Sequence, residues 1–284
     1  MALVPPGPHA PVPHGALAVA QALTQTSAEL GTAIARWRPK SDTPPSDVVL
    51  YALYQQRIYR SLGRSEKLAL ATLPRLAPPL RAFSRDLLTA QRELYVLTPP
   101  LRRRAIKVGR SPPAASLLAD DREAERRFGV PWNVLAAVNF VESKFGKILS
   151  TSAAGAQGPM QFIPSTWRRY GLGGDVHDAH DAILGAANYL RASGAPRHLR
   201  RALHAYNPSQ AYVDGVLRYA RLFGADRTTF TSSTAGRSSS RRRPATGALR
   251  ARAFADPDAE RPDGREAESA VQTLTLRARR KHRR

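Results

Sequence analysis

The chain has 284 residues, 42% of them hydrophobic, which is enough for one or two domains with an apolar core. It contains no cysteine, and this excludes disulfides, thiol catalysis and cysteine-ligated metals. The formal net charge of +22 favours anionic partners, such as nucleic acid, anionic lipid or a cell wall that carries carboxylates and phosphates.

Residues 1–45 are rich in Pro, Ala and Thr and are predicted to be a mostly disordered N-terminal segment, with a short helix near Ala16–Ala22. No Lys or Arg precedes the weakly apolar stretch from Gly15 to Leu23, so this start lacks the features of a secretory signal. The sequence contains no run of about 18 apolar residues, and we expect no transmembrane helix.

Apolar residues at helical spacing predict a helical region over residues 46–97. Ser46-Asp47 and Ser65 can cap the first two of three helices, and the third stops before Pro99-Pro100. These helices carry an apolar stripe but no chemical motif, which favours a packing or docking role. Residues 98–113, with prolines at both ends and three consecutive arginines, are predicted to be a linker.

Residues 114–224 carry most of the chemical information in the sequence. Pro131 marks a helix start and Asp181 is interpreted as a helix cap. Apart from short pairs near residues 150–156 we find no strand, and the sequence predicts a mainly α domain. Residues 225–284 are rich in Ser, Thr and Arg, and they have too little apolar surface for a domain. We predict a basic, disordered tail there.

The helix predicted over residues 131–146 contains Glu142 on its apolar side, four residues after Val138 and three before Phe145. Glu142 also falls in the last turn, where the helix dipole is negative. Desolvation and the dipole both disfavour a carboxylate, so Glu142 should hold its proton well, as a general acid requires. From this helix alone, however, a boundary glutamate that reaches solvent or pairs with Lys144 is the simpler interpretation.

Two later segments change that balance. The segment GAQGPMQF (155–162) has two glycines three residues apart, which permits a tight loop close to a ligand, and Met160 and Gln161 add an apolar contact and an amide. A phosphate-binding interpretation is weak, because the P-loop Lys-Ser/Thr is missing. Further along, Tyr206-Asn207 offers a phenol and an amide that could reach back toward Glu142. Taken separately, each segment also suits an ordinary turn or core position.

Together, Glu142-Ser143, the loop from Gly158 to Phe162 and Ala205-Tyr206-Asn207 resemble the three signature motifs of lytic transglycosylases with a lysozyme-like catalytic domain. The resemblance covers roughly residues 115–223, in the family's order and at its spacings. Residues 51–100 are similar, more weakly, to the helical region that precedes this domain in actinobacterial relatives. The resemblance implies a lysozyme-like fold and peptidoglycan glycan strands as the substrate.

The resemblance also implies roles for individual residues. Glu142 would be the acid/base, Ser152 would steady the N-acetyl group of the muramic acid sugar, and Tyr206 would hydrogen-bond near Glu142. Met160 and Gln161 would line the groove, and Asn207 would help to place the sugar. The substrate-binding set would therefore be Ser152, Met160, Gln161, Tyr206 and Asn207.

Most glycosidases need two carboxylates, roughly 5–10 Å apart. The candidates for a second one, Asp175 and Asp178, lie in a polar loop where solvated turn residues are expected. The resemblance implies a mechanism that needs only Glu142. It would protonate the oxygen between N-acetylmuramic acid and N-acetylglucosamine, then take a proton from the 6-hydroxyl of the same sugar. A 1,6-anhydro ring would form without water.

Three alternatives stay open at this point. A muramidase would hydrolyse the same bond with water, and a non-catalytic domain would hold the glycan without cutting it. A nucleic-acid-binding protein would use the Arg-rich ends, although the tail has almost no interleaved aromatic residues.

The remaining expectations concern ligands, partners and location. His177, His180 and His204 lack a metal-binding pattern, so we expect no metal and no other cofactor. Peptidoglycan is the expected partner, with the basic tail attracted to anionic wall polymers, and no nucleic acid is expected. This function implies an extracellular or cell-wall location.

Overall fold

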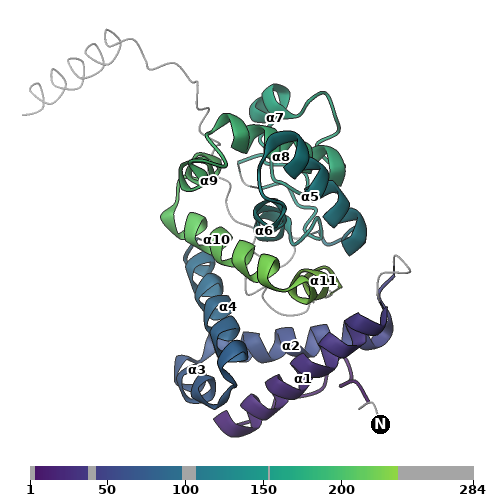
Figure 1. The fold of residues 1–284 in the computed structure, drawn as a ribbon, viewed down its shortest axis with the longest axis vertical. Coiled ribbons are helices and arrows are strands. Elements are labelled where there is room, and N and C mark those ends of the chain that lie inside the picture. Colours follow the sequence, from purple (N-terminus) through teal and green to yellow (C-terminus); the bar gives the residue numbers. More distant parts are fainter. Residues whose placement is uncertain (1–3, 38–42, 98–106, 153, 236–284) are drawn as a thin grey trace, which may run out of the picture. The chain divides into compact units, whose positions relative to one another are not determined.

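The computed structural model describes residues 4–37, 43–97, 107–152 and 154–235. Within these ranges the chain forms eleven α-helices and one 3₁₀ helix, and its β-structure is limited to two isolated bridges (Figure 1). The predicted mainly α class is therefore confirmed. Residues 98–106 of the predicted linker and the basic tail from residue 236 onward lie outside the described residues.

The first part of the chain forms four α-helices with a short 3₁₀ helix before the last one. Their bounds are α1 (Ala16–Trp37), α2 (Ser46–Arg64), α3 (Glu66–Thr72), η1 (Leu73–Arg75) and α4 (Pro78–Val96). Ser65 caps α3 as predicted, since its hydroxyl accepts a hydrogen bond from the Leu68 amide at 3.2 Å. Pro45 occupies the N-cap of α2 and gives no side-chain cap, but the Asp47 carboxylate accepts from the first-turn amide of Val48 at 2.8 Å.

Helix α1 corrects the prediction of a mostly disordered N-terminal segment. It is 22 residues long and buries Val19, Leu23 and Leu30. Several other positions on its buried stripe, such as Ala20 and Thr26, are small or weakly polar. Their low apolarity hides the stripe in the sequence, although small side chains allow close packing of α1 on α2.

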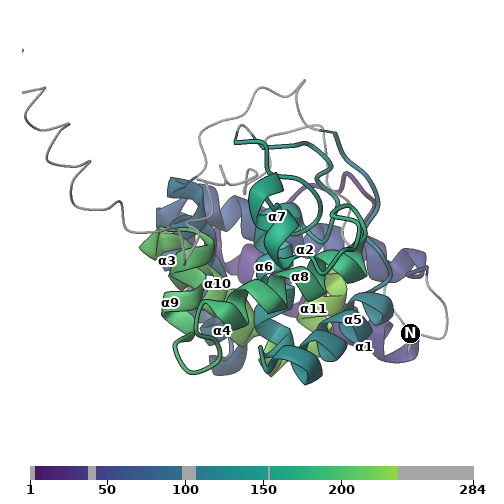
Figure 2. The same cartoon turned by 90° about the horizontal axis from the view of Figure 1, so that it is seen from above.

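Seven further helices follow along the chain. They are α5 (Ala114–Phe128), α6 (Trp132–Ser143), α7 (Pro164–Tyr170), α8 (Ala179–Ala192), α9 (Leu199–Tyr206), α10 (Gln210–Ala225) and α11 (Arg227–Ala235). Helix α6 is apolar around most of its circumference and packs against α5, α8 and α10, in the middle of this group (Figures 1 and 2). A helix that is apolar all round belongs in a core, and α6 is the central element of this one.

Helix α11 corrects the prediction that the tail begins at residue 225. Phe230 is 2% exposed, and its ring packs edge-on against Trp132 and Phe145, with centroids 5.8 and 5.3 Å apart. The surrounding sequence is rich in Thr and Ser, so its composition resembles that of a disordered segment. Phe230 helps to anchor this short helix on the core, and the Lys147 ammonium also donates to the Ser233 carbonyl at 3.1 Å.

The end of the predicted linker is also part of the packed structure. Val108 forms an antiparallel bridge with Ile148, and the Gly109 amide donates to the Lys147 carbonyl at 2.8 Å. The Ser111 hydroxyl donates to the carbonyl of Phe145 at 3.0 Å. This stretch therefore holds the chain that follows α6.

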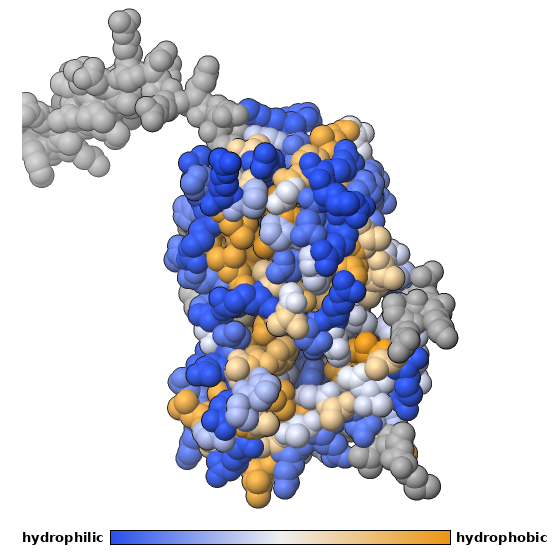
Figure 3. All heavy atoms as spheres, in the orientation of Figure 1, coloured by the Kyte–Doolittle hydropathy of each residue, from blue (hydrophilic) through white to orange (hydrophobic). Residues whose placement is uncertain are grey.

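Hydrophilic side chains cover much of the face drawn in Figure 3, with hydrophobic patches between them. Among the described residues, none of the helices combines the length and the apolarity needed to cross a membrane.

Asp121 is a buried carboxyl in α5 that lies outside the three motifs. It is 1% exposed, and neither of its oxygens has a hydrogen-bond partner among the described residues. Burial raises the pKa of Asp121 well above its usual range, and the nearby Asp120 and Glu125 add to this. A pKa raised in the folded state means that stability is complete below the unfolded-state pKa, about 4, and is lost as the pH rises toward the folded-state pKa.

Replacing Asp121 with asparagine is therefore expected to stabilise the fold at neutral pH. The gain should be a few kcal/mol at most, about 1.4 kcal/mol for each pH unit by which the folded-state pKa exceeds the unfolded one, up to pH 7, because asparagine carries no titrating proton. It should shrink toward zero near pH 4, where the carboxyl is protonated in both states. Urea unfolding of both proteins at the two pH values measures this difference. A variant that is no more stable than the parent at pH 7 would contradict the account of Asp121.

Candidate active site

Glu142 lies in the last turn of α6 and is only 3% exposed, as its helical spacing predicts. Its Oε1 accepts a hydrogen bond from the Tyr212 hydroxyl at 2.7 Å. Its Oε2 has no hydrogen-bond partner among the described residues. Burial raises the pKa of Glu142 to about 8, against the opposing effects of the Tyr212 hydrogen bond and the Lys144 charge. Glu142 is therefore mostly protonated at neutral pH.

The tyrosine that contacts Glu142 is not the one that the sequence suggests. Tyr206 donates its hydroxyl to the Met160 carbonyl at 2.7 Å, and it is Tyr212 in the first turn of α10 that meets Glu142. The two tyrosine rings are parallel to within 6°, with centroids 6.4 Å apart. Tyr206 therefore supports the ring of Tyr212.

Lys144 is the cation whose charge acts on Glu142. It ends α6 in the left-handed conformation, with φ of 57°, and its ammonium donates to the Phe140 carbonyl at 3.0 Å. The same ammonium lies 3.8 Å from the centre of the Phe140 ring. Burial lowers the pKa of Lys144 to about 7, although the Glu142 charge acts in the opposite direction.

Ser143 connects the end of α6 to the glycine loop. Its hydroxyl donates to the Pro159 carbonyl at 2.6 Å and accepts from the Gly146 amide at 2.7 Å. Ser143 is fully buried, so water does not compete for these bonds. The first two motifs are thus held together by one side chain, and the sequence pattern gives no indication of this role.

The glycine loop is a tight hairpin closed by paired backbone hydrogen bonds between Gln157 and Phe162, 2.8 and 2.9 Å long. Gly158 has φ of 73°, and a Cβ atom there would lie 1.8 Å from the Val176 carbonyl oxygen. The predicted need for glycine in this loop is therefore met at Gly158, where another segment of backbone approaches closely.

Met160 and Gln161 differ in what they can offer a ligand. Met160 is completely buried in the main core cluster, which corrects its predicted place along a groove. An apolar side chain next to the core packs there because burial is favourable. Gln161 is 2% exposed and has φ of 52°. Its Nε2 donates to the Gly158 carbonyl at 2.9 Å, while its Oε1 has no partner among the described residues.

A known protein family matches the part of the chain that carries this arrangement. Residues 121–226, from α5 to the end of α10, match the family described as Transglycosylase SLT domain. These residues are an SLT domain. The matched residues include Glu142, the glycine loop and the two tyrosines, whereas α1 to α4 and α11 lie outside the match.

Part of the chain is also similar to a curated relative. The chain is 33% identical over 113 residues to the membrane-bound lytic murein transglycosylase F of Thiobacillus denitrificans (strain ATCC 25259 / T1). The alignment covers 37% of this chain and 24% of the relative, so the chain spans about a quarter of that protein's length. No solved structure gave a significant match.

Ser152 and Asn207, the remaining candidate residues, both lie within the matched region. The Ser152 hydroxyl accepts from the amides of Ala154 and Ala156, at 3.2 and 3.0 Å, and so shapes the loop before the hairpin. Both contacts use the oxygen as an acceptor, which leaves its O–H able to donate. Asn207 is 5% exposed and ends α9 in an extended conformation, directly after Tyr206.

The aspartates considered as a second carboxylate belong to the start of α8. Asp178, and not Asp181 as predicted, caps this helix by accepting from the Asp181 amide at 3.0 Å. Asp181 instead accepts from the Asp175 amide at 2.9 Å and lies 3.3 Å from the His180 ring nitrogen. The groups that shift the pKa of Glu142 are Tyr212 and Lys144, with no carboxylate among them.

The same cluster brings together atoms of the kind that bind metals. Ligand atoms of Asp178, His180 and Asp181 lie within 4.8 Å of one another. His180 also pairs through Nε2 with Glu123 on α5, at 3.2 Å. Asp178 caps α8, and His180 connects α8 to α5. These structural roles account for the proximity of the three side chains.

Proposed function

We propose that the chain is a peptidoglycan lytic transglycosylase with Glu142 as its catalytic acid/base. The observation that carries the proposal is a buried Glu142, in contact with Tyr212 and next to the glycine loop, within the region that matches an SLT domain. Burial raises its pKa to about 8, which suits an acid at neutral pH. The relative's printed name, a lytic murein transglycosylase, supports the same activity.

The first step is protonation of the leaving group. The carboxyl of Glu142 gives its proton to the oxygen that joins N-acetylmuramic acid to N-acetylglucosamine, and the bond from the muramic C1 to this oxygen breaks. The N-acetyl group of the muramic sugar stabilises the cationic carbon. Removal of water from a buried carboxyl keeps the proton available at neutral pH, which suits a general acid.

The second step returns the proton. The Glu142 carboxylate takes the proton of the 6-hydroxyl of the same muramic sugar, and this oxygen bonds to C1. The product has a 1,6-anhydro end, Glu142 is protonated again, and water is not consumed. These two steps need no second carboxylate. This agrees with the groups that shift the pKa of Glu142, which are Tyr212 and Lys144.

Tyr212 and Lys144 stabilise the intermediate carboxylate. The Tyr212 hydroxyl donates to Glu142, and this bond is stronger when Glu142 is charged. The charge of Lys144 in its protonated form also favours the ionised Glu142. The acid needs its proton at the start of the cycle, so activity should fall as the pH rises through about 8.

The activity can be tested with purified peptidoglycan. The full chain should release soluble glycan fragments, and a heat-inactivated sample should not. Release no greater than that of the inactivated sample would overturn the proposed function. Because the substrate lies outside the cytoplasm, we also propose an extracellular or cell-wall location, and recovery of the full-length protein in a cytoplasmic fraction alone would contradict it.

Replacing Tyr212 with phenylalanine should raise the pKa of Glu142 above about 8, because the hydrogen bond that lowers it is lost. The alkaline limb of the pH–rate profile should move to higher pH. Turnover should fall about tenfold or more, since one donor to the developing carboxylate is gone. A suitable control is Tyr54→Phe, because the Tyr54 hydroxyl donates to the Pro11 carbonyl at the surface, and this contact does not involve Glu142. A variant at position 212 with the parent's profile would rule out this role.

A further inference from the structure

Helix α10 is packed between α6 and α4 (Figure 1). On the α6 side, Tyr212 contacts Glu142, and the Tyr219 ring packs against the Phe140 ring with centroids 4.7 Å apart. On the α4 side, Ala90 and Leu94 belong to the same core cluster as α6 and α10. Helix α4 therefore contributes to the core of the SLT domain, although it precedes the residues that match that family.

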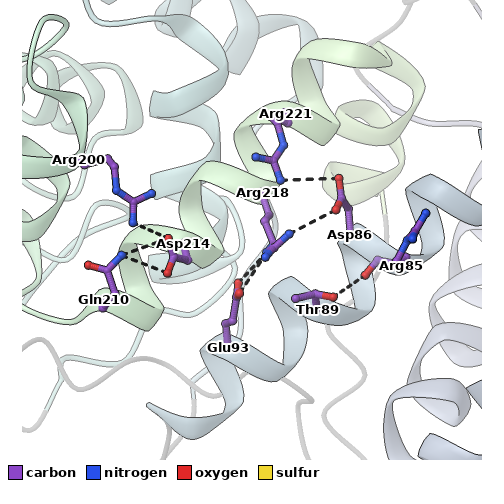
Figure 4. A network of polar contacts seen from close by, with 9 residues as sticks. All are labelled: Arg85, Asp86, Thr89, Glu93, Arg200, Gln210, Asp214, Arg218 and Arg221. Atoms are coloured by element: carbon purple, nitrogen blue, oxygen red, sulfur yellow. Dashed lines mark hydrogen bonds and ion pairs between the residues drawn. The ribbon is translucent and has the colours of Figure 1, made fainter.

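A group of ion pairs joins the two helices (Figure 4). The Arg218 Nε lies 3.1 and 3.0 Å from the two carboxylate oxygens of Glu93, and its Nη1 lies 3.4 Å from Asp86. Arg221 lies 3.7 Å from the other Asp86 oxygen. The side chains of Arg218 and Glu93 are only 28% and 22% exposed, so their attraction is screened less than that of an open surface pair.

A close steric contact lies one turn from these ion pairs. A Cβ atom at Gly215 would be 2.8 Å from Leu94 Cγ and 2.9 Å from its Cδ2. Leu94 is itself only 2% exposed, so its side chain is enclosed by its neighbours. The two helices thus approach as closely as a glycine permits, and the position of α4 limits where α10 can lie.

We propose that α4 positions α10 so that Tyr212 stays in hydrogen-bonding contact with Glu142. Tyr212, Gly215 and Arg218 follow one another at intervals of three residues, over about 9 Å of a stiff helix. A displacement of α10 at the α4 contact is therefore passed to Tyr212. Arg218 and Glu93 act as positioning residues, because neither touches Glu142. The catalytic consequence rests on the proposed function.

The effect of a displacement follows from the groups that face Glu142. Among the described residues these are Tyr212 from α10, Lys144 at the end of α6, and Tyr206 from α9, whose phenol is itself affected by the Glu142 charge. Of these groups, Tyr212 is the one that α10 itself carries. A looser contact weakens the hydrogen bond that lowers the pKa of Glu142, so Glu142 should titrate at higher pH.

The first test replaces Arg218 with methionine and Glu93 with glutamine, in the full-length protein. Carbon-13 NMR of labelled glutamate follows the titration of the Glu142 carboxyl, which is assigned by its absence in Glu142→Gln. Each variant should titrate at higher pH than the parent, by less than Tyr212→Phe. Turnover should fall about threefold to tenfold with little change in KM. The conservative Arg218→Lys should restore part of the loss. Arg92→Gln is the matched control, because it breaks a pair with Glu66 that does not reach α10.

A second test needs no change of charge. Gly215→Ala forces α10 and α4 apart and should shift the Glu142 titration in the same direction, while adding Leu94→Ala should reverse the shift. If folded Arg218→Met, Glu93→Gln and Gly215→Ala all keep the parent's titration, the proposal is overturned. The titration does not depend on turnover, so a parent that fails to cut peptidoglycan would refute the proposed function and leave the positioning role measurable.

Discussion

Glu142→Gln is expected to abolish the release of peptidoglycan fragments and to leave the fold and glycan binding intact. Glutamine has the same shape and can still accept from Tyr212, but it has no acidic proton to give. Loss of general acid–base catalysis costs about 100- to 10,000-fold in rate. Fragment release and binding to insoluble peptidoglycan measure the two properties separately. Glu66→Gln, on the exposed start of α3, is the matched control.

The same substitution should stabilise the protein at neutral pH. The folded-state pKa of Glu142, about 8, exceeds the ordinary value of 4.5, so its contribution to stability is complete below pH 4.5 and is lost as the pH rises through 8. Glutamine removes this loss, for a gain on the order of a few kcal/mol at most.

A Glu142→Gln variant that still cuts peptidoglycan at a tenth of the parent rate would remove Glu142 from the mechanism.

Gly158→Ala is expected to destabilise the fold by several kcal/mol and to eliminate activity with it. The new Cβ would lie 1.8 Å from the Val176 carbonyl oxygen, and φ of 73° is unfavourable for any residue with a side chain. Backbone cannot move aside as a flexible side chain can, so this collision adds to the strain of the left-handed conformation.

Gly155→Ala is the matched control for this prediction. Gly155 precedes the same hairpin and has φ of 80°, but a Cβ atom there would meet nothing within 4 Å. It should cost only about 1–2 kcal/mol, the conformational penalty. Thermal or urea unfolding compares the two variants, and equal losses at positions 155 and 158 would show that the contact with Val176 does not matter.

The features that follow from local periodicity could be predicted from the sequence. Glu142 is buried because its neighbours on α6 recur at helical spacing, and the Ser65 cap is equally local. The contact between Tyr212 and Glu142 joins residues 70 apart in the chain. No local pattern shows which tyrosine reaches Glu142, since Tyr206 and Tyr212 lie on either side of one turn.

Composition misleads where small or polar residues are packed. Helix α1 buries alanines and threonine, and α11 is held by Phe230 within a run of Thr and Ser, so both resemble disordered segments in the sequence. Met160 shows the opposite error, since a methionine beside polar loop residues was expected to face the substrate and instead fills the core. Each case depends on neighbours brought together by the fold.

The mass of the fragments released from purified peptidoglycan tests the central claim most directly. Mass spectrometry separates 1,6-anhydro ends from reducing ends, because the anhydro product is lighter by one water. We expect anhydro ends from the parent chain and none from Glu142→Gln. Reducing ends in their place would show hydrolysis by a muramidase and contradict a mechanism in which Glu142 acts as acid and then as base without water.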